Sequence, residues 1–184
     1  MIEPDLSAKQ RSRHTEVYAT SGMLAFEWNW LDSRIAAGRN PLTSVDIAEL
    51  AQAGITHILD LREEKEWRAP LPGFEAVAFC QECGFVRLHL PLTNLEAPRE
   101  EDFLKALDWL EATLQNPQHK IYIHCQAGKE RTGTIAVALH AHRSGQSYDS
   151  ALQELKQKRN VFRPWPHQEV AVRAWLQASA ESPT

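Results

Sequence analysis

Hydrophobic and polar positions follow two different periods along the chain, and the alternation predicts strands and helices in turn. Short apolar runs rich in β-branched residues are typical of buried strands. These runs lie at 55–61 (ITHILDL), 85–91 (FVRLHLP) and 120–124 (KIYIH), and two further short strands are expected within 14–41. Because helical patterns separate the runs, the sequence predicts an α/β fold, with a mostly parallel central sheet flanked by helices and a helical C-terminal part.

Helical spacing is clearest between residues 98 and 114. There Pro98 suits the first helical position, acidic residues follow it, and Phe103, Leu107, Leu110 and Leu114 recur on one face. A helix at 43–54 has an N-cap at Thr43 or Ser44 and a closing Gly54. Other helices are expected at 74–83, 131–143, 148–158 and 167–178, and the charged run at 62–67 (REEKEW) is expected to be a solvated turn.

Length and composition indicate one soluble globular domain. The chain has 184 residues, of which 43% are hydrophobic and 24% charged. We expect a flexible N-terminus at 1–13 and a single domain at 14–184. The net charge of −4 argues against nucleic acid as the main partner. No apolar run is long enough to span a membrane, and the start of the chain lacks a targeting signal. Three cysteines are too few for a disulfide scaffold, so we expect a cytoplasmic protein with reduced thiols. The sequence does not indicate an oligomeric state.

One loop concentrates the candidate chemistry. HCQAGKERTG, at 124–133, follows a predicted strand and leads into a predicted helix. Such a loop presents backbone N–H groups and the positive end of a helix to an anion. We therefore expect phosphate to bind over the loop, with the planar fork of Arg131 gripping two oxygens. The phosphate-binding residues expected are Gln126, Ala127, Gly128, Lys129, Glu130 and Arg131.

Cys125 lies at the base of this loop. Its N–H groups and Arg131 stabilise the thiolate, which is the nucleophilic form of cysteine. A phosphate held above the sulfur would be attacked to give a cysteinyl-phosphate, which water then hydrolyses. The hydroxyl of Thr132 is suited to stabilise the sulfur as it leaves.

The loop resembles the H-C-x5-R-[ST]-G motif of cysteine-dependent protein tyrosine and dual-specificity phosphatases. The resemblance covers roughly residues 20–178 and implies that Cys125 is the nucleophile, Arg131 the phosphate-binding arginine and Thr132 the supporting hydroxyl. His124 matches the histidine before the cysteine. The segment NVFRPWPHQEVAVRAWLQ is similar to the family's tail, which implies that Gln168 helps to position water. The resemblance implies no metal and no other cofactor.

The sequence departs from the family at the general acid. Most members carry an Asp about thirty residues before the cysteine, but LPLTNLEAP has none at the equivalent place. Some phosphoinositide-active members instead have an acidic residue just before the loop arginine, after "GK", and AGKERTG is similar to them. We therefore take Glu130 as the candidate acid, with Glu96 and Asp102 in reserve.

Residues outside the loop allow alternative interpretations. Cys80 and Cys83 form C-x2-C without a second pair for zinc, so they are partly buried thiols or protect Cys125 from oxidation. Arg62 either reaches the substrate or braces the loop, or it belongs to a solvated charge run. Trp165 either lines the rim of the site or is ordinary packing.

The expected partner is a phosphorylated protein or a small phosphorylated substrate. Phosphotyrosine or general phosphoprotein hydrolysis is the first hypothesis. Hydrolysis of phosphoinositides or inositol polyphosphates is the second, because of Lys129 and the missing upstream Asp. A phospho-binding module without turnover is the rival from another class, and sulfur or arsenate chemistry on the same kind of loop is a further one.

Overall fold

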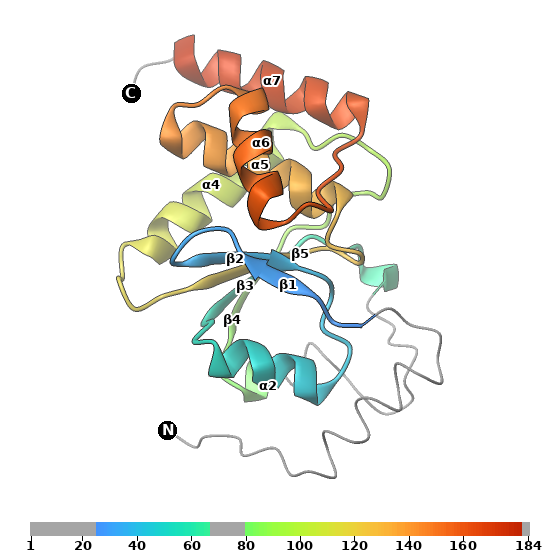
Figure 1. The fold of residues 1–184 in the computed structure, drawn as a ribbon, viewed down its shortest axis with the longest axis vertical. Coiled ribbons are helices and arrows are strands. Elements are labelled where there is room, and N and C mark those ends of the chain that lie inside the picture. Colours follow the sequence, from blue (N-terminus) through green and yellow to red (C-terminus); the bar gives the residue numbers. More distant parts are fainter. Residues whose placement is uncertain (1–24, 67–79, 182–184) are drawn as a thin grey trace.

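Five strands form one sheet in the computed structural model, which describes residues 25–66 and 80–181 (Figure 1). The strands are β1 (Trp28–Trp30), β2 (Ile35–Gly38), β3 (His57–Asp60), β4 (Val86–His89) and β5 (Ile121–His124). Their order is β1-β2-β5-β3-β4. The β1–β2 pair is antiparallel and the other three pairs are parallel. The expected α/β fold with a mostly parallel sheet is confirmed.

Strand β5 occupies the centre of the sheet, between β2 and β3. Its last residue, His124, lies opposite Gly38 of β2 on one side and Asp60 of β3 on the other. All three residues end their strands, and ligands of open α/β sheets bind outside these carboxyl ends. The loop that follows His124 therefore begins where three strands end together.

Helices cover both faces of the sheet. They are α2 (Ser44–Gln52), α4 (Glu100–Leu114), α5 (Glu130–Ser144), α6 (Tyr148–Lys158) and α7 (Pro166–Glu181), and a 3-10 turn, η1 (Glu64–Glu66), follows β3. Figure 1 shows α2 on one face and α4 to α7 on the other. The core divides in the same way, since Ile121 and Ile123 of β5 pack in the larger cluster with α4 to α7, whereas Tyr122 packs with Ile47 of α2.

Side-chain caps fix where two of these helices begin. Thr43 caps α2 as expected, and it forms a reciprocal pair of hydrogen bonds with Asp46. Helix α4 begins after Arg99, whose backbone N–H donates to the Asp102 carboxylate at 2.8 Å. The prediction that Pro98 occupies the first helical position is therefore wrong, because this cap holds Arg99 in an extended conformation after the proline.

The remaining helix predictions divide into tested and untested ones. Those at 131–143, 148–158 and 167–178 are confirmed within a few residues by α5, α6 and α7. The predicted helix at 74–83 lies mostly outside the described residues, as does the expected flexible segment at 1–13. Within the part of the chain that is described, no helix is both long and apolar enough to cross a bilayer.

Candidate active site

Cys125 is the first residue after β5 and is almost completely buried, with 1% of its surface exposed. Its Sγ accepts a hydrogen bond from the backbone N–H of Gly128 at 3.3 Å. The loop then enters α5, whose first N–H groups have no partners within the helix. A sulfur held at the base of such a loop lies where a bound anion would meet it.

The loop rests directly against the end of β2. Gly128 adopts a left-handed conformation, with φ of 68°, and a Cβ there would collide with the backbone carbonyl of Gly38. Beyond β2, the Asn40 N–H donates to the Gln126 carbonyl at 3.3 Å. Glycine is required at position 128 for both conformation and space.

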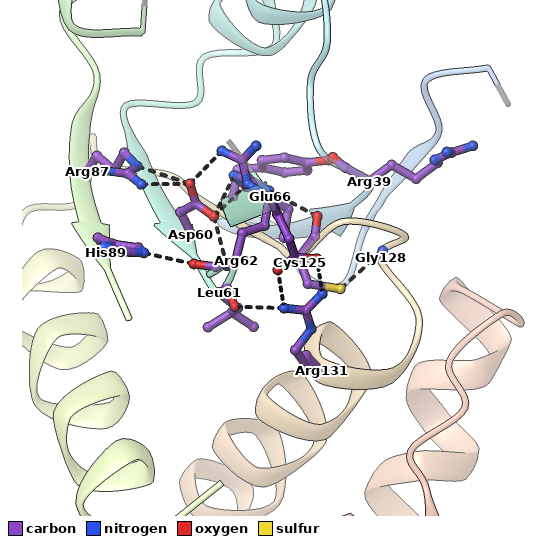
Figure 2. A network of polar contacts seen from close by, with 12 residues as sticks. Arg39, Asp60, Leu61, Arg62, Glu66, Arg87, His89, Cys125, Gly128 and Arg131 are labelled. Carbon is purple, nitrogen blue, oxygen red and sulfur yellow. Dashed lines mark hydrogen bonds and ion pairs between the residues drawn. The ribbon is translucent and has the colours of Figure 1, made fainter. Parts of the chain in front are cut away.

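Arg131 and Glu66 form a two-pronged ion pair beside the sulfur. Nη1 of Arg131 lies 2.6 Å from one carboxylate oxygen of Glu66, and Nη2 lies 2.7 Å from the other. Figure 2 shows Arg131 and Gly128 converging on the Cys125 sulfur. The predicted solvated turn at 62–67 is confirmed for Glu64 and Lys65, which are exposed. It is wrong for Glu66, which turns inward to neutralise this buried arginine.

Further contacts fix the plane of the Arg131 guanidinium. Nη1 also donates to the carbonyls of Leu92 at 3.2 Å and Leu61 at 3.4 Å. Burial lowers the pKa of Arg131, but the bonds and charge of Glu66 outweigh it, so the pKa is raised. Its Nε makes no hydrogen bond within the described residues, so one edge of the fork remains for an anion.

Asp60 anchors the base of the loop. Its buried carboxylate receives Nε and Nη2 of Arg62 at 2.9 and 2.7 Å, and Nη2 of Arg87 at 2.8 Å (Figure 2). Burial acts to raise the pKa of Asp60, but His124 and the two arginines outweigh it and hold the pKa well below its usual range. Arg62 is 4% exposed, so it braces the site through Asp60 and is not part of a solvated run.

His124 links Asp60 to the loop. Its Nδ1 lies 3.2 Å from the Cys125 carbonyl, and because a carbonyl only accepts, Nδ1 carries the proton. Nε2 lies 3.9 Å from Asp60. Burial lowers the pKa of His124 to about 4, although Asp60 acts in the opposite direction. The imidazole is therefore neutral near pH 7.

The loop residues expected to bind phosphate differ in exposure. Gln126 is exposed, Ala127 and Lys129 are half-buried, and Gly128 and Arg131 are buried. The hydroxyl of Thr132 is buried and makes no hydrogen bond within the described residues. A buried hydroxyl without a partner is costly, so a ligand or the sulfur is its natural acceptor.

The three acid candidates lie in different surroundings. Glu130 begins α5, is half-buried, and its carboxylate has no ion-pair partner in the described ranges. Glu96 lies exposed in the loop between β4 and α4. The Asp102 carboxylate already accepts the Arg99 N–H that caps α4. Glu130 and Glu96 thus keep an unengaged carboxylate.

Gln168 is fully buried, and both ends of its amide are bonded within the protein. Its Oε1 accepts the Thr134 hydroxyl and the Trp165 N–H, both at 3.0 Å, and its Nε2 donates to the Glu96 carbonyl at 2.9 Å. These contacts tie the loop carrying Glu96 to α5 and α7. The role of Gln168 in positioning water stays a prediction, and Trp165, 42% exposed, stays a candidate for the rim.

Cys80 lies beside Asp60 and Arg62 but on the other face of the sheet from Cys125. Cys80 packs in the cluster that faces α2, whereas Cys125 belongs to the cluster on the other face. Burial raises the pKa of the Cys80 thiol to about 12, so it is poorly suited to attack a disulfide or bind zinc. Among residues 25–66 and 80–181, no three His, Cys, Asp or Glu side chains gather as a metal site.

Sequence reasoning missed two side chains that hold the loop. One is Glu66, which lies in a charged run without periodicity. The other is Arg159, whose Nε donates to the Gly128 carbonyl at 3.2 Å. The sequence motif ends well before Arg159, so no local signal indicated its position.

Known proteins resemble this chain in sequence and in fold. Human dual specificity protein phosphatase 1 is 31% identical over 71 residues, which are 39% of this chain and 19% of that protein. The structure of Tk-PTP in its active form covers 82% of this chain and 96% of its own, at 27% identity and a TM-score of 0.71. The structure of PTPMT1 in complex with PI(5)P covers 84% of this chain and 97% of its own. Its TM-score of 0.74 shows a shared fold, at a sequence identity of 17%.

A family model also matches most of the chain. The PTP-SAK model, which describes a Swiss Army Knife protein with a DSP-PTPase phosphatase domain, matches residues 26–170. This range contains the loop at 124–133 with Arg131, and also Arg159. It also contains the acid candidates Glu96, Asp102 and Glu130. Because the match spans more than half of the chain, this protein belongs to the PTP-SAK family of DSP-PTPase phosphatase domains.

Proposed function

We propose that this protein hydrolyses phosphomonoesters through a cysteinyl-phosphate on Cys125, as a phosphatase of the protein tyrosine and dual-specificity type. The observation that carries the proposal is the hydrogen bond from the Gly128 N–H to the Cys125 sulfur, beside the guanidinium of Arg131. Membership of the family supports it. The matched part of the curated relative is only a fifth of that protein, so the activity of the whole protein is part of this proposal.

The first chemical step transfers the phosphoryl group to sulfur. The thiolate of Cys125 attacks phosphorus, the S–P bond forms, and the bond from phosphorus to the ester oxygen breaks. That oxygen takes a proton from a general acid and leaves as an alcohol or phenol. Backbone N–H groups of the loop and the free edge of Arg131 hold the three phosphoryl oxygens.

The second step releases phosphate. Water attacks phosphorus, gives its proton to the carboxylate formed in the first step, and the S–P bond breaks. The electron pair returns to sulfur as thiolate, which is the better leaving group when a hydroxyl stabilises it. Thr132 supports this role, because its buried hydroxyl has no other partner in the described residues.

Glu130 is the proposed general acid. Its carboxylate is half-buried next to Arg131 and free of ion pairs in the described ranges, whereas Arg131 is already neutralised by Glu66. Glu96 is the alternative, since Gln168 holds the backbone of its loop against α7. Asp102 is disfavoured by its cap on α4.

Phosphotyrosine or other phosphoprotein is the proposed substrate. Phosphoinositides or inositol polyphosphates are the second candidate, favoured by Lys129 beside Glu130 in the loop and by the PI(5)P complex of PTPMT1. A phospho-binding module is the rival of another class, which the retained Cys125 and Arg131 argue against. The three free cysteines suit a reducing compartment, so a cytoplasmic location is part of the proposal.

Hydrolysis of para-nitrophenyl phosphate tests the proposal. Wild-type protein should release nitrophenolate without added metal, and Cys125→Ser should abolish release while still binding vanadate. Arg173→Met, which alters an exposed ion pair, is the matched control and should keep wild-type activity. A Cys125→Ser variant as active as wild type would end the proposal, and an inactive wild type that binds vanadate would favour the binding module.

A further inference from the structure

Arg159 is a second buried arginine against the phosphate loop. It follows α6 directly and is 4% exposed, as is Arg131. Its Nε donates to the Gly128 carbonyl at 3.2 Å, and its Nη1 donates to the Asn29 side chain at 2.8 Å. One side chain therefore connects α6, the loop and β1.

No carboxylate is among the hydrogen-bond partners of Arg159 in the described residues. Both of its acceptors are neutral oxygens, and within the described ranges it forms no ion pair. A guanidinium stays protonated even when buried, so its environment needs negative charge. Burial lowers the pKa of Arg159, while Tyr122, Glu27 and Cys125 act to raise it.

Several other charged groups around Cys125 are already matched or neutral. Arg131 is paired with Glu66, and Asp60 receives Arg62 and Arg87. His124, the last residue of β5, is uncharged near pH 7 because burial lowers its pKa. Burial also raises the pKa of Tyr122. Lys129 and Glu130 carry opposite charges but form no ion pair within the described ranges. The carboxylate of Glu27 acts to raise the pKa of Arg159, and Arg39 acts to lower it. A thiolate on Cys125 would be a further negative group that balances the charge of Arg159.

The hydrogen bond to Gly128 also has a geometric effect. In a trans peptide, the C=O and the following N–H point in opposite directions. Because Arg159 holds the Gly128 carbonyl, the Lys129 N–H points away from Arg159. A flip of this peptide would present a carbonyl oxygen in place of that N–H donor. The flip would change ψ of Gly128 and φ of Lys129, which is −120°. Gly128 resists such a change little, so the bond from Arg159 adds to the resistance of the Lys129 backbone.

We propose that Arg159 is a positioning residue of the phosphate loop, which fixes the Gly128–Lys129 peptide and supplies positive charge that favours the Cys125 thiolate. The inference rests on the proposed function, in which Cys125 is the nucleophile. It adds a residue outside the loop motif, and it predicts that the reactivity of the sulfur depends on the end of α6.

Alkylation of Cys125 by iodoacetamide tests this without any substrate. The rate is followed against pH by peptide mass spectrometry, which separates Cys125 from exposed Cys83. Arg159→Met keeps the length of the side chain but removes the charge and both donors. In this variant, the alkylation midpoint, which is the pH at which the alkylation rate is half of its maximum, should rise by about one pH unit. The kcat/KM for para-nitrophenyl phosphate should fall about tenfold. Arg159→Lys should shift the midpoint less, because it keeps the charge.

Arg173→Met is the control, since Arg173 lies at the surface in ion pairs with Asp149 and Glu169. It should leave the midpoint unchanged. A midpoint in Arg159→Met equal to wild type would overturn the proposal, even if activity fell. Should Arg159→Met fail to fold, Arg159→Lys and Asn29→Ala decide in the same way, since both must raise the midpoint. Failure of the proposed function would appear separately, as turnover in Cys125→Ser.

Discussion

Arg131 and Arg159 are equally buried beside the same loop, yet they meet different partners. Arg131 places two nitrogens on the carboxylate of Glu66, whereas Arg159 places two on neutral oxygens. The ion pair with Glu66 cancels most of the charge of Arg131. The main contribution of Arg131 to phosphate binding is therefore the orientation of its guanidinium. Arg159 keeps its charge, which acts on the sulfur. Two residues of one type thus differ in how their charge is compensated.

The first test of this comparison concerns Glu130, whose carboxylate forms no ion pair with Arg131. If Glu66 alone neutralises Arg131, Glu130 is free to donate a proton. An alkyl leaving group needs that proton in the transition state, whereas nitrophenolate hardly does. Glu130→Gln should therefore slow an alkyl phosphate by about 10²–10⁴-fold and spare para-nitrophenyl phosphate, as steady-state kinetics would measure.

Two matched variants complete this experiment. Glu96→Gln and Asp102→Asn should leave the ratio of the two substrates unchanged. Equal slowing of both substrates by Glu130→Gln would assign the residue to loop shape, and the acid role would pass to Glu96.

Arg131→Lys tests the geometric role. Lysine keeps the charge but loses the planar fork that meets both Glu66 and a phosphate edge. We expect kcat/KM for para-nitrophenyl phosphate to fall. The fall should correspond to a loss of about 2–4 kcal/mol of transition-state stabilisation, by analogy with the loss of an oxyanion donor. Arg159→Lys should lose far less, because charge is its main contribution. Near-wild-type kinetics in Arg131→Lys would remove the distinction between the two arginines.

The pH dependence of stability tests whether the His124 imidazole is uncharged in the folded protein. Its pKa is about 4 in the folded protein and about 6.5 when unfolded, so the unfolded chain takes up the proton first. Stability from this group is complete above pH 6.5 and is lost as the pH falls toward 4. Urea unfolding at pH 7 and pH 4 should show a loss of about 3 kcal/mol that His124→Gln lacks. An equal loss in both proteins would mean that His124 is already charged in the fold.

The sequence predicts the two arginines unequally well, for a physical reason. Arg131 lies in a contiguous loop between a strand and a helix, so local spacing brings it to Cys125. Strand β5 and helix α6 were also predicted closely, because periodicity is a local property. Arg159 and Glu66 reach the site through tertiary packing, from the end of α6 and from a turn after β3. Nothing in KRN at 158–160 or in EKE at 64–66 distinguishes an inward side chain from a solvated one.

Glu66→Gln should have the smallest effect, and it makes Arg131 resemble Arg159. The amide keeps the shape of the carboxylate but removes its charge, and it turns an N–H toward the guanidinium. Glu66 is 17% exposed, so solvent screens part of the loss, and we expect a fall of about 1–2 kcal/mol in the free energy of unfolding. Glu64→Gln, on the exposed side of the same turn, is the control. The guanidinium loses its orientation but gains uncompensated charge, so kcat should fall while vanadate binds no more weakly. If Glu66→Gln matched Glu64→Gln in urea unfolding and in kcat, the ion pair would contribute nothing and the two arginines would act alike.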